Sequence, residues 1–285
     1  MTGVVAIPSD RYHADDIADT PTLSSSIASL LCTATPLHAY TAHPKLNPDW
    51  KPAKDKDAWD FGTCAHALLL EGIDRAVVVD ADSWRTNAAK EERDAARAAG
   101  QVPLLTKDWD AMQAMVAAVR EQMARHQADP PLFTDGKPEQ TIVWEEDGVV
   151  CRARIDWLRD DHAAVDDLKT TSRSANPDAY KRNLFSVGGD VQCAFYLRGL
   201  KRLAGVDAQW RWVVVETSPP FAVSVISPGP DVLALGEAKV EYAIRRWREC
   251  LSSGEWPGYP LEVVRAELPP WEEARWLERE LSEAA

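Results

Sequence analysis

The sequence predicts an α/β protein in which a central mixed β-sheet is flanked by helices. Helical apolar spacing dominates residues 1–130, strand-like runs begin near residue 137, and helix and strand patterns then alternate along the chain. This order favours one sheet with helices packed against it. We expect a single domain over residues 1–285, with a mainly helical N-terminal part at 1–130, a core at 137–226 and a C-terminal helix and tail at 227–285.

The N-terminal part contains several helix signals. In "LSSSIASLL", Ser24 or Ser25 can cap a helix whose apolar face begins at Ile27, and Pro36 is placed to open a second helix. The stretch "FGTCAHALLLEG" has helical apolar spacing that is interrupted by His66 and Glu71. Two further helices are expected, in the Ala-rich residues 84–99 and in residues 107–126.

The pattern then changes to strands. "QTIVWEEDGVVCRARIDWL" is two strand-like runs joined by a short turn, which is a hairpin signal, and "HAAVDDLK" supplies a third strand. Helices are expected at "NPDAYKRNLF" and "VQCAFYLRGLKRL", strands at "QWRWVVVE" and "FAVSVIS", and a long helix at 230–252. The Pro- and Trp-rich tail ends in a short acidic helix.

Composition excludes several classes of protein. The five cysteines are scattered with no C-x-x-C pair, which argues against a zinc knuckle or an iron-sulfur cluster and favours a reducing compartment. No stretch approaches the roughly 20 apolar residues that cross a bilayer, and the first residues lack a signal-peptide pattern. We therefore expect a cytoplasmic protein that does not contact a membrane.

The formal charge of -13 at first opposes binding to nucleic acid. Its distribution weakens that objection, because residues 169–202 carry seven basic side chains against the two acidic ones of Asp178 and Asp190. The basic residues are Lys169, Arg173, Lys181, Arg182, Arg198, Lys201 and Arg202. Either a basic strip for phosphates or an ordinary solvated helix face explains this segment.

The candidate catalytic residues lie where two strands are expected to end. Asp156 closes the second strand, and Asp167 lies eleven positions later at the end of the third, a natural separation for carboxylates on adjacent antiparallel strands. Lys169 shares a face with Asp167, because alternate strand residues point the same way. Two close carboxylates call for a cation, and oxygen ligands suit Mg²⁺ or Mn²⁺. The pattern indicates metal-assisted phosphodiester cleavage.

Four more polar residues can join this site. Gln192 and Tyr196 are four apart and share one helix face, from which they can position a phosphate and a base or sugar. His66 and Glu71, set in an apolar helix, can approach from the other side. Each of them also has an ordinary structural explanation, since a buried histidine is more often simply hydrogen-bonded.

The order of these motifs carries a family resemblance. "GTCAH", "RID", "DLK" and "QCAFY" resemble the successive motifs of the RecB-like branch of the PD-(D/E)xK nuclease superfamily. The whole chain, from "LSSSIASLL" to the "EWPGY" tail, resembles the phage-type exodeoxyribonuclease VIII (RecE-like) family. This implies a restriction-endonuclease-like core, and a protein of phage or prophage origin in a bacterial cell.

The resemblance also assigns roles. It implies a magnesium site made by His66, Asp156, Asp167 and the Leu168 carbonyl, with Lys169 as the catalytic lysine. Gln192 and Tyr196 become supporting active-site residues, and Glu139 matches a position that binds a second ion or its waters. Asp167 stands where many members have Glu. The lone Cys250 excludes the subfamily with a four-cysteine iron-sulfur cluster.

The implied activity is that of a DNA exonuclease. Such enzymes process duplex ends from the 5′ side and leave a 3′ single strand for a single-strand annealing protein, and the resemblance implies a ring-shaped homo-oligomer. Two alternatives stay open: a DNA-binding recombination factor with an inactive nuclease site, and a structure-specific or nicking endonuclease. RNA cleavage would use the same chemistry. We expect Arg173, Lys181, Arg182, Arg198, Lys201 and Arg202 to hold the DNA.

Overall fold

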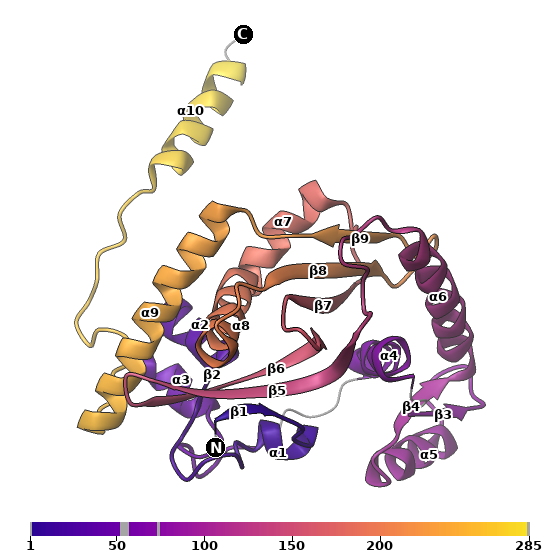
Figure 1. The fold of residues 1–285 in the computed structure, drawn as a ribbon. Coiled ribbons are helices and arrows are strands. Elements are labelled where there is room, and N and C mark those ends of the chain that lie inside the picture. The colour runs from indigo at the N-terminus through magenta and orange to yellow at the C-terminus, as the bar shows by residue number, and fades with distance from the viewer. Residues whose placement is uncertain (1, 52–56, 73–74, 284–285) are drawn as a thin grey trace.

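The computed structural model, which describes residues 2–51, 57–72 and 75–283, is built around one mixed sheet (Figure 1). Its strands run in the order β1-β5-β6-β7-β8-β9, and β2 pairs with β6 beside this path. The β7–β8 and β2–β6 pairs are parallel and the others are antiparallel. The predicted α/β class with a mixed sheet is confirmed.

The strands of this sheet include every strand expected from the sequence. Their bounds are β1 (Gly3–Val5), β2 (Leu23–Ser24), β5 (Gly136–Glu146), β6 (Val149–Arg159), β7 (Ala164–Thr171), β8 (Gln209–Glu216) and β9 (Val223–Ile226). The expected hairpin is β5–β6, whose turn contains Asp147 and Gly148, both with positive φ. A separate parallel pair, β3 (Ala76–Val79) and β4 (Val102–Leu105), lies among the N-terminal helices.

Helices cover both faces of the sheet (Figure 1). One apolar core includes side chains of α2 (Ser25–Thr33), α3 (Pro36–Ala42), α7 (Pro177–Ser186), α8 (Gly189–Ala204) and α9 (Pro230–Ser253). The other lies under α4 (Asp57–His66), the π-helical turn η1 (Ala67–Glu71) and α6 (Thr106–Arg125). The remaining helices are α1 (Ser9–His13), α5 (Asn87–Ala98) and α10 (Pro270–Glu283).

The two central helices of the first layer cross at very short range. A Cβ added to Gly236 of α9 would lie 2.4 Å from the carbonyl oxygen of Asp190 and 2.8 Å from the Cβ of Ala194, both in α8. No real side chain fits there, so glycine sets how closely α9 approaches α8. That approach in turn holds α8 firmly against the sheet, where Gln192 and Tyr196 lie.

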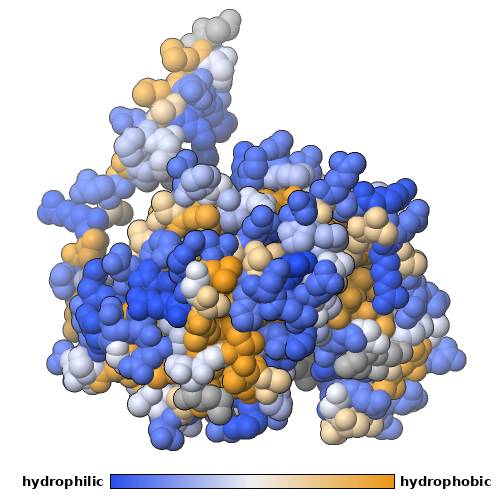
Figure 2. Space-filling view, viewed as in Figure 1, coloured by the Kyte–Doolittle hydropathy of each residue, from blue (hydrophilic) through white to orange (hydrophobic). Residues whose placement is uncertain are grey.

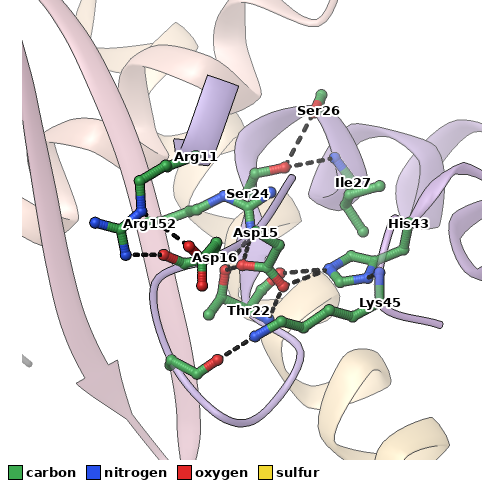
Figure 3. Close-up of polar contacts among 11 residues, drawn as sticks. Arg11, Asp15, Asp16, Thr22, Ser24, Ser26, Ile27, His43, Lys45 and Arg152 are labelled. Carbon is green, nitrogen blue, oxygen red and sulfur yellow. Dashed lines mark hydrogen bonds and ion pairs between the residues drawn. The ribbon is translucent and has the colours of Figure 1, made fainter. Parts of the chain in front are cut away.

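A buried polar cluster anchors the N-terminal segment to β6 (Figure 3). The Asp15 carboxylate accepts hydrogen bonds from the Thr22 amide at 3.0 Å and hydroxyl at 2.5 Å, lies 3.3 Å from His43 Nε2, and pairs with Arg152 of β6. All four side chains are buried. The cluster places the start of α2, where the Ser24 hydroxyl accepts from the Ile27 amide as predicted for a cap.

Two expectations about strands need correction. Neither Asp156 nor Asp167 closes its strand, because β6 continues to Arg159 and β7 continues to Thr171. The two carboxylates are accommodated within the strands because they meet polar partners rather than the apolar core. The N-terminal part also contains β3 and β4, whose four-residue runs are too short to show strand periodicity.

The tail after α9 extends away from the body (Figure 1). α10 buries none of its side chains. Hydrophilic side chains dominate the face of the body drawn in Figure 2, apart from an apolar strip in its lower middle, and apolar side chains also appear on α10. Within the described residues, no helix is long and apolar enough to cross a membrane.

Candidate active site

The candidate site lies where β6 and β7 separate. Their ladder pairs Leu158 with Val165 and Trp157 with Asp166 and goes no further. At the next step the Leu168 amide donates to Asp156 Oδ2 at 2.9 Å, so a side chain replaces the backbone partner. The strands therefore open at the point where Asp156 and Asp167 face each other.

The alternation of β7 separates its two adjacent aspartates. Asp166 is buried against Arg211, with Oδ1 to Nε at 2.5 Å and Oδ2 to Nη2 at 3.0 Å. Asp167 points to the opposite face with Lys169, whose Nζ lies 2.6 Å from Asp167 Oδ2. Gln192 of α8 donates to Asp167 Oδ1 at 2.9 Å. The run "VDDLK" thus contributes Asp166 to a structural ion pair, and it contains the Asp167–Lys169 ion pair that borders the opening.

His66 reaches the opening from the last residue of α4, just before the chain tightens into η1. Its Nδ1 lies 3.2 Å from Glu139 Oε1, and its Nε2 lies 3.1 Å from Asp156 Oδ2. Arg154, two residues before Asp156 on β6, pairs with the same Glu139. The structure therefore joins a helix, β5 and β6 at one point.

The electrostatics of this group follow from burial and from its close partners. Burial opposes protonation of His66, but the two carboxylates outweigh it and raise its pKa to about 10. The same contacts hold the pKa of Asp156 and of Glu139 below the ordinary range in spite of burial. Without a metal, an imidazolium balances the acidic pair, so a cation that binds here must displace that proton.

Asp167 differs from its neighbours. Burial raises its pKa to about 6, the Lys169 charge opposes this, and the nearby Asp156 adds to it. Burial lowers the pKa of Lys169, but Asp167 and Asp156 outweigh it, and the net shift is upward. Like charges close to one another in a dry site shift pKa values in this way. A positive ion near the two aspartates would relieve the repulsion.

The donor set fits a divalent cation. One ligand atom each from His66, Glu139 and Asp156 lie within 4.8 Å of one another. Oxygen donors with one imidazole suit Mg²⁺ or Mn²⁺. Asp167 is not in this set, but its Oδ2 is buried and accepts no directed hydrogen bond among the described residues, although Lys169 is close. At Leu168 it is the amide that contacts Asp156; the role of its carbonyl stays a prediction.

Tyr196 and Glu71 line two hollows beside these groups. The first, here called the His66 hollow, is about 420 Å³ and includes His66, Glu71 and Glu139. The second, here called the Tyr12 hollow, is about 980 Å³ and includes Tyr12, Asp156 and Tyr196. Burial raises the pKa of Tyr196 well above its usual value, so its hydroxyl stays protonated. Both hollows also include Arg154.

The residues of the predicted basic strip differ in whether they have acidic partners. Arg198 and Arg202 bind Glu146, and Arg198 also binds Glu237. Lys201 pairs with Asp207 at 2.5 Å, and Lys181 pairs with Asp178 at 2.8 Å. Arg173 and Arg182 have no acidic partner among the described residues. They line a third hollow, together with Tyr180.

Two residues at the site were not singled out from the sequence. Arg154 has a local signal, because in "RARID" it shares a strand face with Arg152 and Asp156. Tyr180 has none. Its ring is buried under α7, and its proximity to Lys169 and Asp167 appears only in the fold.

The comparisons with known proteins bear on the fold. A family model described as a PDDEXK-like domain of unknown function (DUF3799) matches residues 32–266. The chain belongs to this PDDEXK-like family. The predicted PD-(D/E)xK fold is confirmed. No curated protein matches the chain.

Two solved structures similar to this chain are described as exonucleases. A candidate exonuclease from Eubacterium rectale has a TM-score of 0.62 and 14% sequence identity, over 94% of this chain and 98% of that one. At this identity the likeness shows the fold. A phage-related exonuclease from Haemophilus somnus 129PT has 14% identity over 82% of this chain and 97% of that one, and its TM-score of 0.31 carries no argument.

Proposed function

We propose that this chain is a metal-dependent exodeoxyribonuclease that hydrolyses phosphodiester bonds at duplex DNA ends, working from the 5′ side and leaving 3′ single-stranded tails. The observation that carries the proposal is the cluster of His66, Glu139 and Asp156, which lies directly beside the Asp167–Lys169 pair. A set of possible metal ligands next to a half-buried lysine suits cleavage of a phosphodiester.

Each group has a part to play. His66, Glu139, Asp156 and Asp167 would hold Mg²⁺, or Mn²⁺ in its place, and a bound ion would activate a water and neutralise phosphate charge. Lys169 is held by Asp167 at 2.6 Å, so its charge is placed to stabilise the phosphorane or to act on the attacking water. Gln192 fixes the Asp167 carboxylate from the other side.

The biological setting follows from the resemblance. We propose that the enzyme acts in phage-type recombination in the bacterial cytoplasm, beside a single-strand annealing protein and as a ring-shaped homo-oligomer. Light scattering of the purified protein tests the ring, and co-purification with the annealing protein tests the partner. These two properties are independent of the cleavage chemistry.

The activity is tested with linear duplexes labelled at either the 5′ or the 3′ end, with Mg²⁺ and with EDTA. We expect 5′-labelled mononucleotides or short products first, and none in EDTA or from Asp156→Asn. Supercoiled circular DNA should stay intact, because an exonuclease needs an end. Cutting of the circle would assign an endonuclease, binding without cleavage by the wild type would assign an inactive recombination factor, and preferred cleavage of RNA would change the substrate class.

A further inference from the structure

The third hollow lies on the lysine face of the sheet. Thr171, the last residue of β7, shares a face with Asp167 and Lys169, because these residues alternate along the strand. The hollow is about 370 Å³ and is lined by Thr171, Arg173 and Ser174 from the end of β7 and the segment that follows, and by Tyr180, Arg182 and Asn183 of α7. We call it the Arg173 hollow.

Its chemistry is that of an anion site. Both arginines are exposed and have no acidic partner among the described residues, whereas Lys181, next to Arg182 in sequence, is bound to Asp178 at 2.8 Å. Hydroxyl and amide groups complete the lining. A guanidinium presents several donors in a fixed plane and suits phosphate oxygens.

Tyr180 lines the Arg173 hollow and also lies near the candidate catalytic lysine. Burial raises the pKa of the Tyr180 hydroxyl, while its hydrogen bond with Asn183 and the Lys169 charge act in the opposite direction. Thr171, which lies two residues after Lys169 on the same strand face, also lines the hollow, so the hollow lies beside the candidate catalytic lysine.

We propose that the Arg173 hollow is a phosphate subsite for the DNA strand being cut, in which Arg173 and Arg182 bind a backbone phosphate. The proposal rests on the proposed nuclease function and refines it. The other half of the basic strip, around Arg198 and Arg202, is internally neutralised and is not part of the DNA path.

The test measures binding of a fluorescent linear duplex in EDTA, where no cleavage occurs, as a function of salt. Arg173→Gln/Arg182→Gln should lower the salt slope by about two phosphate contacts, each worth near 0.9. Arg245→Gln, at an exposed arginine of α9, is the control and should leave the salt slope unchanged.

An unchanged slope in Arg173→Gln/Arg182→Gln, or an equal loss in Arg198→Gln/Arg202→Gln, would overturn the proposal. Duplexes with a 5′-phosphate or a 5′-hydroxyl separate the sources of the anion. An equal loss with both supports a backbone phosphate, and a loss confined to the phosphorylated end would assign the hollow to the terminal phosphate instead. Wild-type cleavage in Mg²⁺ is scored separately, so the subsite can fail while the nuclease stands, or the reverse.

Discussion

At the scale of single residues, Asp167 and Lys169 of the "VDDLK" run are expected to have different roles, the first in metal binding and the second in catalysis. If Asp167 helps to hold the ion while Lys169 acts on water or on phosphorane charge, Asp167→Asn should lose Mg²⁺ affinity together with activity. Lys169→Ala should still bind Mg²⁺ and DNA, but its single-turnover rate should fall about a hundred- to a thousand-fold. Calorimetric Mg²⁺ titration and end-labelled digestion of both variants measure the two effects. Near-wild-type cleavage by Lys169→Ala would contradict the assignment.

Glu139 tests which residues hold the ion. The structure joins it to His66 and Asp156, whereas the resemblance assigns it to a second ion or its waters. If it is a direct ligand, Glu139→Gln should weaken the tightest Mg²⁺ binding by at least about tenfold, as measured by calorimetry. Glu145→Gln removes a charge from an exposed site on the same strand and should leave affinity unchanged. If the Glu139→Gln variant binds its tightest Mg²⁺ with wild-type affinity but binds one ion fewer, the result would favour the second-ion role.

At the scale of elements, the Asp15 cluster joins the N-terminal segment to β6. Burial opposes ionisation of Asp15, but His43, Arg152 and Thr22 lower its pKa below the ordinary value. A lowered folded-state pKa adds stability above the unfolded-state pKa of about 3.9, and this is lost as the pH falls through the folded-state value. Asp15→Asn should therefore destabilise the fold near neutral pH by about 3 kcal/mol, and the difference from wild type should shrink in acid.

Urea unfolding at several pH values measures this effect. The matched control is Asp16→Asn, since Asp16 is 69% exposed and pairs only with the exposed Arg11 among the described residues. It should change stability by less than about 1 kcal/mol at any pH. A difference for Asp15→Asn that stays constant down to acid pH would show that packing, not charge, makes the cluster stabilising.

At the scale of the whole molecule, the C-terminal tail has a first part that packs on the body and a second part, α10, that does not. Trp256 packs on Tyr40 and Trp247, with ring centroids 5.5 and 5.2 Å apart, whereas α10 buries no side chain. Removal of residues 267–285 should leave the melting temperature within about 2 °C of wild type. Trp256→Ala should lower it by several degrees, since about 1–3 kcal/mol of packing is lost. Calorimetry of both variants measures this, and a large loss on truncation would mean that α10 is packed in solution.

Local periodicity is what the sequence by itself determined about this protein. The alternation of apolar and polar residues located β5 to β9, and it placed Asp167 and Lys169 on one face because a strand repeats every two residues. Helical spacing and the Ser24 cap located α2 in the same way. The order of four motifs then indicated the PD-(D/E)xK fold, which the match of residues 32–266 to a PDDEXK-like family confirms.

Only the tertiary structure decided which distant groups meet. His66 contacts Glu139 and Asp156 because α4 packs over the opening between strands that lie far along the chain. The basic strip splits because its acidic partners Glu146 and Glu237 come from β5 and α9, which no local pattern links to α8. The net charge of a sequence segment counts only residues that are neighbours in the chain. Charge at a site is set by neighbours in space, and those depend on how the helices pack against the sheet.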